Sequence, residues 1–494
     1  MRTVRSRVRS VLALVGVVVA AGLWAGATPA VASAASDVPS PTVTGPITGG
    51  SHGFPYDSTV VDLARFGYTE QEFFYSGTAR AFTNVGALGS DGRWSVTPSS
   101  TAGYETRLLV RRPVNPKRFN GTVIVEWLNV STGADVGVGW SAALTELLRD
   151  GFAWVGVSAQ TVGVNGLPPG NPLGNAGALK VWDPARYGSL VHPGDSYSYD
   201  IFSQAGRALS HPNGVDPLGS LRVQHLIAAG ESQSAARLTT YYDAVQPRAN
   251  VYDGFLIISR GDGSTPLSQA PQPAIATPRP LAFRSDLRVP VLAYETETDL
   301  IFLGYFNSRQ PDNPFFRDWE VAGSTHVDLY TLTNVSRDIA KSLPGATMPT
   351  CALPLNDGPG HFVQADASQE LREWVSGGTP PPVAPRLDVV NAGATKVIVR
   401  DSLGNAVGGI RLPQLQVPTA AYSGLGNSGA NPFCVLFGTT APFDAGTLAS
   451  LYPNHGRYVS RVAGAAIHDV AAELLLPADA RQIVEQAAES GIGR

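Results

Sequence analysis

The pentapeptide Gly-Glu-Ser-Gln-Ser at 230–234 is the segment whose residue types and setting best suit covalent chemistry. It follows an apolar run at 221–229 that is typical of a buried strand, and a helix-like segment at 235–244 comes after it. A sharp turn between a strand and a helix presents the side chain at its tip, here Ser232. We therefore expect Ser232 to act as a nucleophile.

Such a turn crowds the residues two positions before and two positions after the serine, so both must be small. Gly230 and Ser234 meet this demand, although Ser234 replaces the glycine that more often stands there. The backbone N–H of Gln233 is the expected first donor to the oxyanion that forms when a carbonyl is attacked. The second donor is expected from the loop after an earlier strand, as either the side chain of Asn129 or the N–H of Val130.

A serine hydroxyl is a weak nucleophile unless a histidine takes its proton and an acid orients that histidine. On a turn of this kind the chain order is serine, acid, histidine. The acid is expected just past the strand predicted at 289–296, where Asp299 and Glu297 are the two alternatives. We favour Asp299, while the longer side chain of Glu297 would also serve.

Two downstream histidines are alternatives for the base. His326 follows a short apolar strand at 319–323 and a loop of small residues, which is a setting that can hold an imidazole over the serine. His361 lies in a glycine-rich loop before a helix, another common setting for a hydrolase base, but it requires a long insertion after the acid. We favour His326.

The segments around these residues alternate between strand and helix. Apolar runs typical of buried parallel strands occur at 121–128, 151–158, 221–229, 252–259 and 289–296. Helix-like segments occur at 140–150, 198–210 and 235–244, and two further β-rich stretches at 72–83 and 104–111. This alternation predicts an α/β fold with a mostly parallel central sheet and helices on both faces.

The first part of the chain has the pattern of an export signal. Residues 1–34 contain a basic start, an uncharged run and small-x-small cleavage sites, which predict a signal peptide and a secreted product. The alternative is an uncleaved anchor, whose apolar run would be at the short edge of the roughly 17–25 residues that span a bilayer. We favour secretion.

The remaining chain divides at a proline-rich linker near residue 380. Residues 41–378 are the expected catalytic domain, with a Gly-, Pro- and Asn-rich insertion at 163–194 that either walls the pocket or forms a structural lid. Residues 386–494 are the expected C-terminal region packed on that core, with a hairpin at 396–411 and a final helix at 478–490.

Charge and cysteine content limit the partners and the compartment. The 494 residues include 36 Lys and Arg against 40 Asp and Glu, a net charge of −4, and no basic stripe that would bind nucleic acid. Cys351 and Cys434 are the only cysteines. In an exported protein two cysteines most often form one disulfide, and two buried thiols are the alternative.

Five segments, at 123–130, 183–190, 230–234, 319–323 and 408–413, together resemble a bacterial family described only as an α/β-hydrolase domain of poorly defined substrate. The resemblance extends over nearly the whole mature chain. It implies the α/β-hydrolase fold and Ser232 as nucleophile, and the family pattern Glu-Val-Ala-Gly-x-x-His favours His326. It does not decide between Asp299 and Glu297, and it supplies no substrate.

The sequence therefore predicts an exported serine hydrolase that cleaves a small or polymeric carboxylic ester through Ser232, His326 and Asp299. Ester is preferred to amide by analogy with other hydrolases of this fold. We expect no metal or organic cofactor, no nucleic-acid partner and no membrane span after cleavage. Acyl transfer on the same residues, or a catalytically silent extracellular binding protein, are the alternatives.

Overall fold

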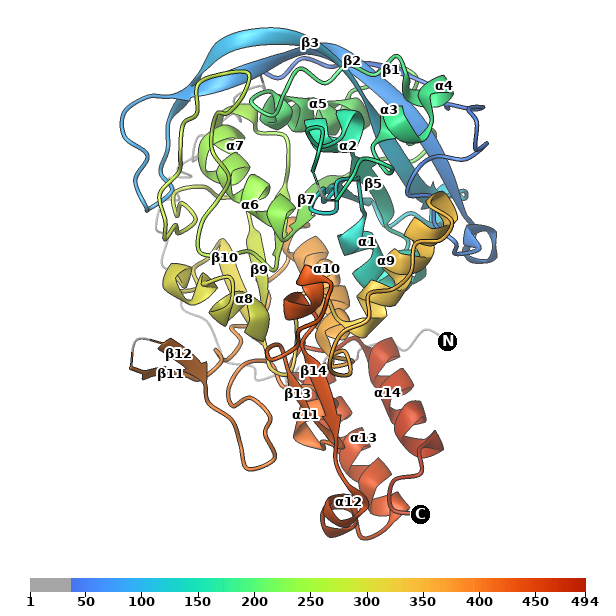
Figure 1. The fold of residues 1–494 in the computed structure, drawn as a ribbon, viewed down its shortest axis with the longest axis vertical. Coiled ribbons are helices and arrows are strands. Elements are labelled where there is room, and N and C mark those ends of the chain that lie inside the picture. Colours follow the sequence, from blue (N-terminus) through green and yellow to red (C-terminus); the bar gives the residue numbers. More distant parts are fainter. Residues whose placement is uncertain (1–36, 172, 394) are drawn as a thin grey trace, which may run out of the picture. The chain divides into compact units, whose positions relative to one another are not determined.

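A ten-stranded sheet lies at the centre of the computed structural model, which describes residues 37–494 apart from 172 and 394 (Figure 1). The signal peptide expected at 1–34 lies outside the described residues. In spatial order the strands are β10 (Phe316–Val321), β9 (Val291–Thr296), β8 (Gly254–Ile258), β7 (His225–Glu231), β4 (Thr122–Trp127), β5 (Ala153–Val157), β3 (Val96–Pro113), β2 (Tyr68–Asn84), β1 (Thr42–Thr44) and β6 (Asn213–Gly214).

The six strands from β10 to β5 run parallel to one another. Beyond them β3 pairs antiparallel with β5, and β2 and β1 continue the sheet antiparallel. In a parallel arrangement the carboxyl ends of neighbouring strands meet at one edge, which is where open α/β sheets bind ligands. The loops that follow β4, β7, β9 and β10 therefore share that edge.

Alternate residues of β4 face two separate apolar clusters, with Val123 and Val125 in one and Ile124 in the other. Helices α5 (Ser198–Ser210) and α6 (Gln233–Thr240) cover the first cluster, and α1 (Val138–Arg149) and α10 (Gly360–Val375) cover the second. Because both faces of the sheet are buried, its central strands are mainly apolar, and β8 contains no polar side chain. The α/β class and the mostly parallel sheet predicted from the sequence are confirmed.

The β-rich stretches predicted at 72–83 and 104–111 are parts of the two longest strands, β2 and β3, which pair antiparallel with a bulge at Ala81 and Phe82. The region predicted as irregular at 163–194 contains the short helices α3 (Leu179–Trp182) and α4 (Pro184–Tyr187), and α2 (Thr161–Asn165) runs into it. Other short elements are η1 (Leu63–Phe66), η2 (Pro116–Arg118), η3 (Tyr241–Val245), α7 (Gln246–Ala249), α8 (Glu297–Ile301) and η4 (Tyr305–Ser308).

After β10 the chain forms α9 (Leu329–Ser342), α10 and then a set of small elements. These are β11 (Val389–Ala392), β12 (Thr395–Ile398), α11 (Pro413–Gln416), β13 (Ala420–Ser423), η5 (Pro432–Leu436), β14 (Thr439–Pro442), α12 (Ala445–Leu451), α13 (His455–Ala471) and α14 (Pro477–Glu489). Within 396–411, where the sequence predicts a hairpin, Arg400 and Ala406 form an antiparallel bridge, and the N–H of Val407 donates to Val399 at 2.9 Å. The strand β12 at the start of this segment also pairs with β11, and Ile410 at its end forms a bridge with Val321 of β10.

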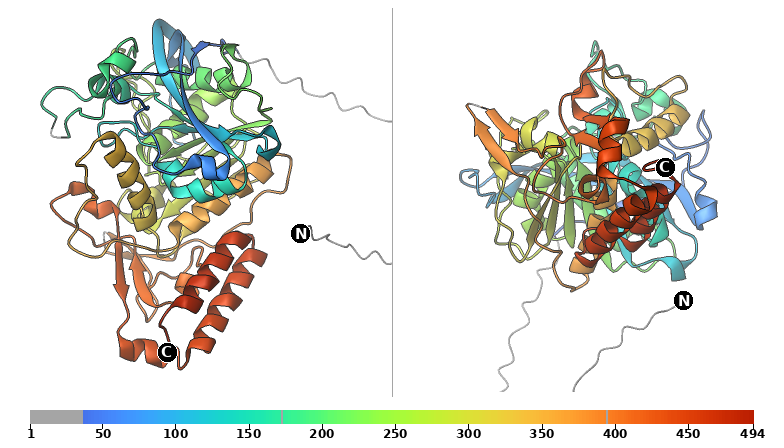
Figure 2. Two further views of the ribbon diagram at one scale, coloured as in Figure 1. Left: turned by 90° about the vertical axis from the view of Figure 1, so that its right-hand side faces the viewer. Right: turned by 90° about the horizontal axis from the view of Figure 1, so that it is seen from below.

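Helices α13 and α14 lie side by side (Figure 2) and pack on the rest of the chain through apolar and charged contacts. Val462 of α13 and Ile483 of α14 belong to the same apolar cluster as Leu371 of α10. Arg149 of α1 forms an ion pair with Asp479 of α14 at 2.8 Å. Within the described part of the chain, no helix has the length and apolar character needed to cross a bilayer.

A disulfide joins Cys351, in the loop after α9, to Cys434 in η5. The sequence left this bond and two free thiols open, and the structure contains the bond. It closes a loop of 83 residues that starts before α10 and includes β11 to β13. It therefore ties the C-terminal region to the segment after α9.

We expect the Cys351→Ser, Cys434→Ser double variant to lose about 2–4 kcal/mol of unfolding free energy, because the disulfide restricts a long loop in the unfolded chain. Urea denaturation followed by tryptophan fluorescence measures the loss. The wild type in reducing agent is the matched control and should unfold at the same urea concentration as the double variant. Equal stability of the double variant and the oxidised wild type would contradict the expectation.

Candidate active site

Ser232 occupies the turn between β7 and α6 with a left-handed backbone, at φ 58° and ψ −114°. Residues other than glycine rarely adopt this conformation, which costs about 1–3 kcal/mol and recurs at functional sites. A Cβ at Gly230 would lie 3.0 Å from the backbone of Ser234. The small residue expected at position 230 is therefore required by contact with the chain four residues later.

Ser232, His326 and Asp299 are brought together from three different segments that follow strands at the carboxyl edge of the sheet. The Oγ of Ser232 lies 2.8 Å from Nε2 of His326. On the other side of the ring, Nδ1 of His326 donates to Oδ1 of Asp299 at 2.6 Å. The side chains of His326 and Asp299 are buried. This contact chain has the order in which a carboxylate orients a base and the base activates a hydroxyl.

The carboxylate of Asp299 is held in position by the start of α8. Its Oδ2 accepts hydrogen bonds from the N–H and the hydroxyl of Thr296, at 2.8 and 2.6 Å, and the Thr296 hydroxyl caps the helix in return. This reciprocal arrangement is a capping box. It leaves Oδ1 directed at His326, so the same residues that begin the helix also fix the acid.

Glu297, the alternative acid, has a different set of partners. Its carboxylate accepts from the N–H of Gly323 at 2.8 Å and of Gly424 at 3.0 Å, and it forms an ion pair with Arg400 at 2.8 Å. Glu297 thus joins the loop that precedes His326 to two segments of the C-terminal region. The carboxylate of Glu297 therefore binds these groups and does not contact the imidazole of His326.

His361, the alternative base, pairs with another carboxylate. Its Nδ1 donates to Oδ2 of Asp328 at 2.8 Å, and its ring stacks on Tyr330 with centroids 4.2 Å apart. Asp328 also caps α9 by accepting from the N–H of Thr331. Burial raises the pKa of Asp328, but the ion pair with His361 and the hydrogen bonds from His361 and Thr331 together outweigh burial and lower it. His361 therefore stabilises the junction of α9 and α10.

A second carboxylate, which the sequence did not single out, lies beside the imidazole. Oε1 of Glu231 is 3.2 Å from Nε2 of His326, on the same side as the Ser232 hydroxyl. Its Oε2 accepts from the side-chain amide of Asn129 at 3.2 Å. The only available sequence signal was its position directly before the nucleophile, which does not reveal the direction of the side chain.

The two carboxylates shift the pKa of the imidazole. Burial by itself would lower the pKa of His326, but the negative charges of Glu231 and Asp299 outweigh burial and raise it to about 9. Burial raises the pKa of Glu231 to about 7, although His326 opposes this shift. The negative charges of Glu231 and Asp299 thus stabilise the protonated form of the imidazole relative to a free histidine.

The expected oxyanion donors occupy different environments. Gln233 is the first residue of α6, where backbone N–H groups lack partners within the helix. The Asn129 amide donates both to the backbone carbonyl of Glu231, at 3.1 Å, and to its carboxylate, so this side chain is used within the protein. Val130 is buried in the same loop.

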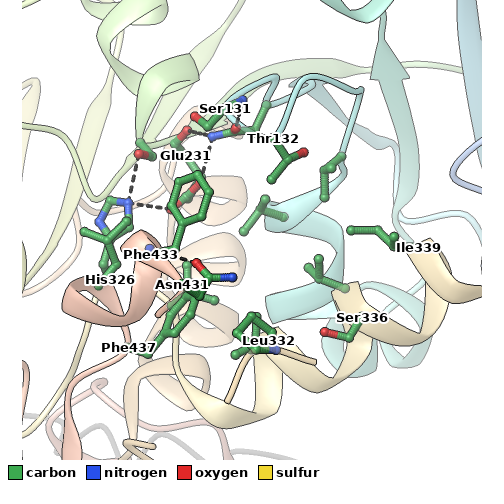
Figure 3. Close-up of a pocket in the computed structure, with 18 of the residues that line it drawn as sticks. Ser131, Thr132, Glu231, His326, Leu332, Ser336, Ile339, Asn431, Phe433 and Phe437 are labelled. Carbon is green, nitrogen blue, oxygen red and sulfur yellow. Dashed lines mark hydrogen bonds and ion pairs between the residues drawn. The ribbon is translucent and has the colours of Figure 1, made fainter. Parts of the chain in front are cut away.

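A cavity of about 270 Å³ opens beside Ser232 and His326. Figure 3 shows some of the residues that line it, among them His326, Leu332 and Phe433. Its walls come from the loop after β4, from α9 and the loop that follows, and from η5 in the C-terminal region. Of the described residues at 163–194, which the sequence left as a possible wall, none lines it. Sequence reasoning did not predict that η5 forms part of the cavity wall. The possible disulfide between Cys351 and Cys434 was the available signal, because it brings residues 431–437 close to residues 346–349.

Among the described residues, no cluster of His, Cys, Asp or Glu side chains has the arrangement of a metal site. His192 and Asp195, which lie close in sequence, have other partners. The ring of His192 contacts the backbone carbonyl of Ala159 at 2.9 Å, and Asp195 forms an ion pair with Arg237 at 2.8 Å.

A family model described as an alpha/beta hydrolase domain matches residues 43–485. Among curated proteins, no relative matches the chain. Similar solved structures include an rPPE esterase variant, with 11% identity, TM-score 0.31 and coverage of 64% of this chain and 85% of the other.

Two further similar structures are a glucuronoyl esterase from Teredinibacter turnerae and a thermostable esterase from Pseudomonas putida. The first has 10% identity and TM-score 0.29, covering 69% of this chain and 79% of the other. The second has 12% identity and TM-score 0.25, covering 48% of this chain and 66% of the other.

We expect Glu231→Gln to lower the pKa of His326 by about one unit or more, because it removes a negative charge next to Nε2 while keeping the side-chain shape. Titration of the assigned His326 ring resonances by NMR measures the change. Glu297→Gln is the matched control: it also neutralises a buried glutamate, but one whose charge is paired with Arg400, and should leave this pKa nearly unchanged. An unchanged or higher His326 pKa in Glu231→Gln would contradict the assignment.

Proposed function

This chain belongs to the α/β-hydrolase domain family, and we propose that it is a secreted serine hydrolase that cleaves carboxylic esters through Ser232, His326 and Asp299. One observation carries the proposal: the contacts of 2.8 Å and 2.6 Å that join these three side chains. They lie beside a cavity large enough for part of a small substrate.

In the proposed reaction the Oγ of Ser232 attacks the ester carbonyl while its proton passes to Nε2 of His326. The new bond converts the carbonyl oxygen into an oxyanion. When the carbon–oxygen ester bond breaks, Nε2 returns the proton to the departing alcohol and an acyl group remains on Ser232. Water then attacks this acyl-enzyme with His326 again as base, which releases the carboxylic acid and restores the serine.

Asp299 has the role of orienting the ring in this proposal. Its hydrogen bond to Nδ1 selects the tautomer that leaves Nε2 free to accept the serine proton. Its negative charge stabilises the imidazolium formed after proton transfer. The capping box with Thr296 supports this role, because it prevents the carboxylate from rotating away.

The proposed oxyanion donors are the backbone N–H groups of Gln233 and Val130. Gln233 begins α6, and the positive end of the helix dipole favours negative charge there. The Asn129 amide is bonded to Glu231, which leaves the Val130 N–H as the second donor of the two expected from that loop. Backbone donors of this kind are fixed before the reaction and need no reorganisation.

Export is part of the proposal and has independent support from the disulfide. Cys351 and Cys434 are bonded, and such bonds persist in oxidising compartments outside the cytoplasm. The signal-peptide pattern at 1–34 agrees with that compartment.

We expect Ser232→Ala to reduce the hydrolysis of p-nitrophenyl butyrate by several orders of magnitude, because no other side chain replaces the attacking oxygen. A fluorophosphonate probe should form one covalent adduct on wild-type Ser232 and none on the variant, as measured by intact-mass and peptide analysis. A wild-type rate in Ser232→Ala would refute the mechanism. An unlabelled wild type without turnover would favour a silent binding protein.

We expect Asp299→Asn to lower kcat by about 10⁴-fold, because an amide in this position stabilises the wrong tautomer of His326. Glu297→Gln is the matched control, since it changes the alternative acid by the same atoms and should retain most of kcat. Steady-state kinetics on p-nitrophenyl butyrate, with circular dichroism to verify folding, compare the two. A large loss of kcat in Glu297→Gln with little loss in Asp299→Asn would instead identify Glu297 as the acid that orients His326.

A further inference from the structure

The cavity beside Ser232 has one long apolar wall, formed by a single face of α9. Leu332, Val335 and Ile339 line it at spacings of three and four residues, which place side chains on one face of a helix. Because this face is turned toward the cavity, the apolar side chains of α9 are available to a bound molecule.

A second apolar wall lies in the C-terminal region. Phe433, Leu436 and Phe437, in and directly after η5, line the cavity together with the face of α9 (Figure 3). Asn431 accepts a hydrogen bond from the N–H of Phe433 at 2.9 Å and so caps η5. The neighbouring Cys434 is buried and bonded to Cys351 in the loop after α9. The disulfide thereby joins the backbone segments of both walls.

The cavity has no basic side chain from a lysine or an arginine among the described residues that line it. Only Glu231 and His326 among these residues carry ionisable side chains. His326 already faces Glu231 and Asp299. A carboxylate on a substrate would therefore lose its hydration without gaining a cationic partner, which is strongly unfavourable.

From these walls we infer that the substrate is a neutral ester with one apolar substituent of medium length, and that α9 and η5 select that substituent. The inference rests on the proposed ester hydrolysis and names its substrate class. The cavity of about 270 Å³ is much larger than the roughly 30 Å³ that one water molecule occupies in the liquid, so it has room for several carbon atoms. A substituent of about four to eight carbons fits that space.

Two ester series test the inference on the full mature protein. One varies the acyl chain of p-nitrophenyl esters from acetate to laurate, and the other varies the alcohol of alkyl acetates. We expect kcat/KM to rise by about fourfold per methylene in at least one series, which corresponds to about 0.8 kcal/mol per buried CH₂, and then to fall beyond about eight carbons. A flat or falling profile in both series would overturn the inference.

A matched pair of esters tests the charge preference. p-Nitrophenyl pentanoate and the p-nitrophenyl monoester of glutarate have similar length, but the second carries a carboxylate. We expect the neutral ester to be favoured by more than about a hundredfold in kcat/KM, because the cavity offers the anion no counter-charge. Equal rates, or preference for the anion, would overturn the inference.

Substitutions on α9 test whether its apolar face determines the preferred chain length of the substrate. Ile339→Phe should shift the optimum chain length to shorter substituents, and Val335→Phe tests the same wall if the first variant does not fold. Arg337→Phe is the control, because Arg337 is exposed on α9 and does not line the cavity. If the optimum chain length shifts in Arg337→Phe but not in Ile339→Phe or Val335→Phe, the face of α9 does not select the substituent.

Fluorophosphonate labelling of Ser232 separates the two possible failures. One outcome is that Ser232 is labelled and esters are cleaved, but the rates do not depend on chain length or charge. The inferred substrate class is then wrong, while the proposed hydrolase activity is retained. If Ser232 is not labelled and no ester is cleaved, the proposed function itself fails.

Discussion

The candidate site depends on one constraint: the strands β7, β9 and β10 are parallel, so their carboxyl ends meet at a single edge of the sheet. Ser232, Asp299 and His326 each follow one of these strands. The contact chain between them forms because the sheet fixes the starting points of three segments. The left-handed backbone of Ser232 is stable within this frame, where the Ser232 N–H donates to Ile258 of β8 at 2.9 Å.

Buried charge gives the site its electrostatic character. Two carboxylates flank a single imidazole, and each has additional partners: the N–H and hydroxyl of Thr296 bind Asp299, and the amide of Asn129 binds Glu231. These hydrogen bonds compensate part of the cost of burying negative charge. The imidazole between them has a raised pKa, and the site is therefore poised to stabilise an imidazolium, which is the species that proton transfer from a serine creates.

The C-terminal region contributes to the site through packing and through covalent and ionic links. Glu297 holds Arg400 and the N–H of Gly424 next to the loop that leads to His326. The disulfide of Cys434 places η5 against the segment after α9, where both face the cavity. A region that follows a proline-rich linker in sequence thus forms part of the wall of the cavity beside Ser232.

The sequence by itself determined the central strands, the turn at Ser232 and the two alternatives each for acid and base, because continuous apolar runs and small residues at 230 and 234 report local and burial constraints. Only the tertiary structure decided which alternative meets the serine: Glu297 and His361 have suitable residue types, but Arg400 and Asp328 already pair with them. It also placed Glu231 and η5 at the site. These depend on side-chain direction and on contacts between segments far apart in the chain, which residue spacing does not encode.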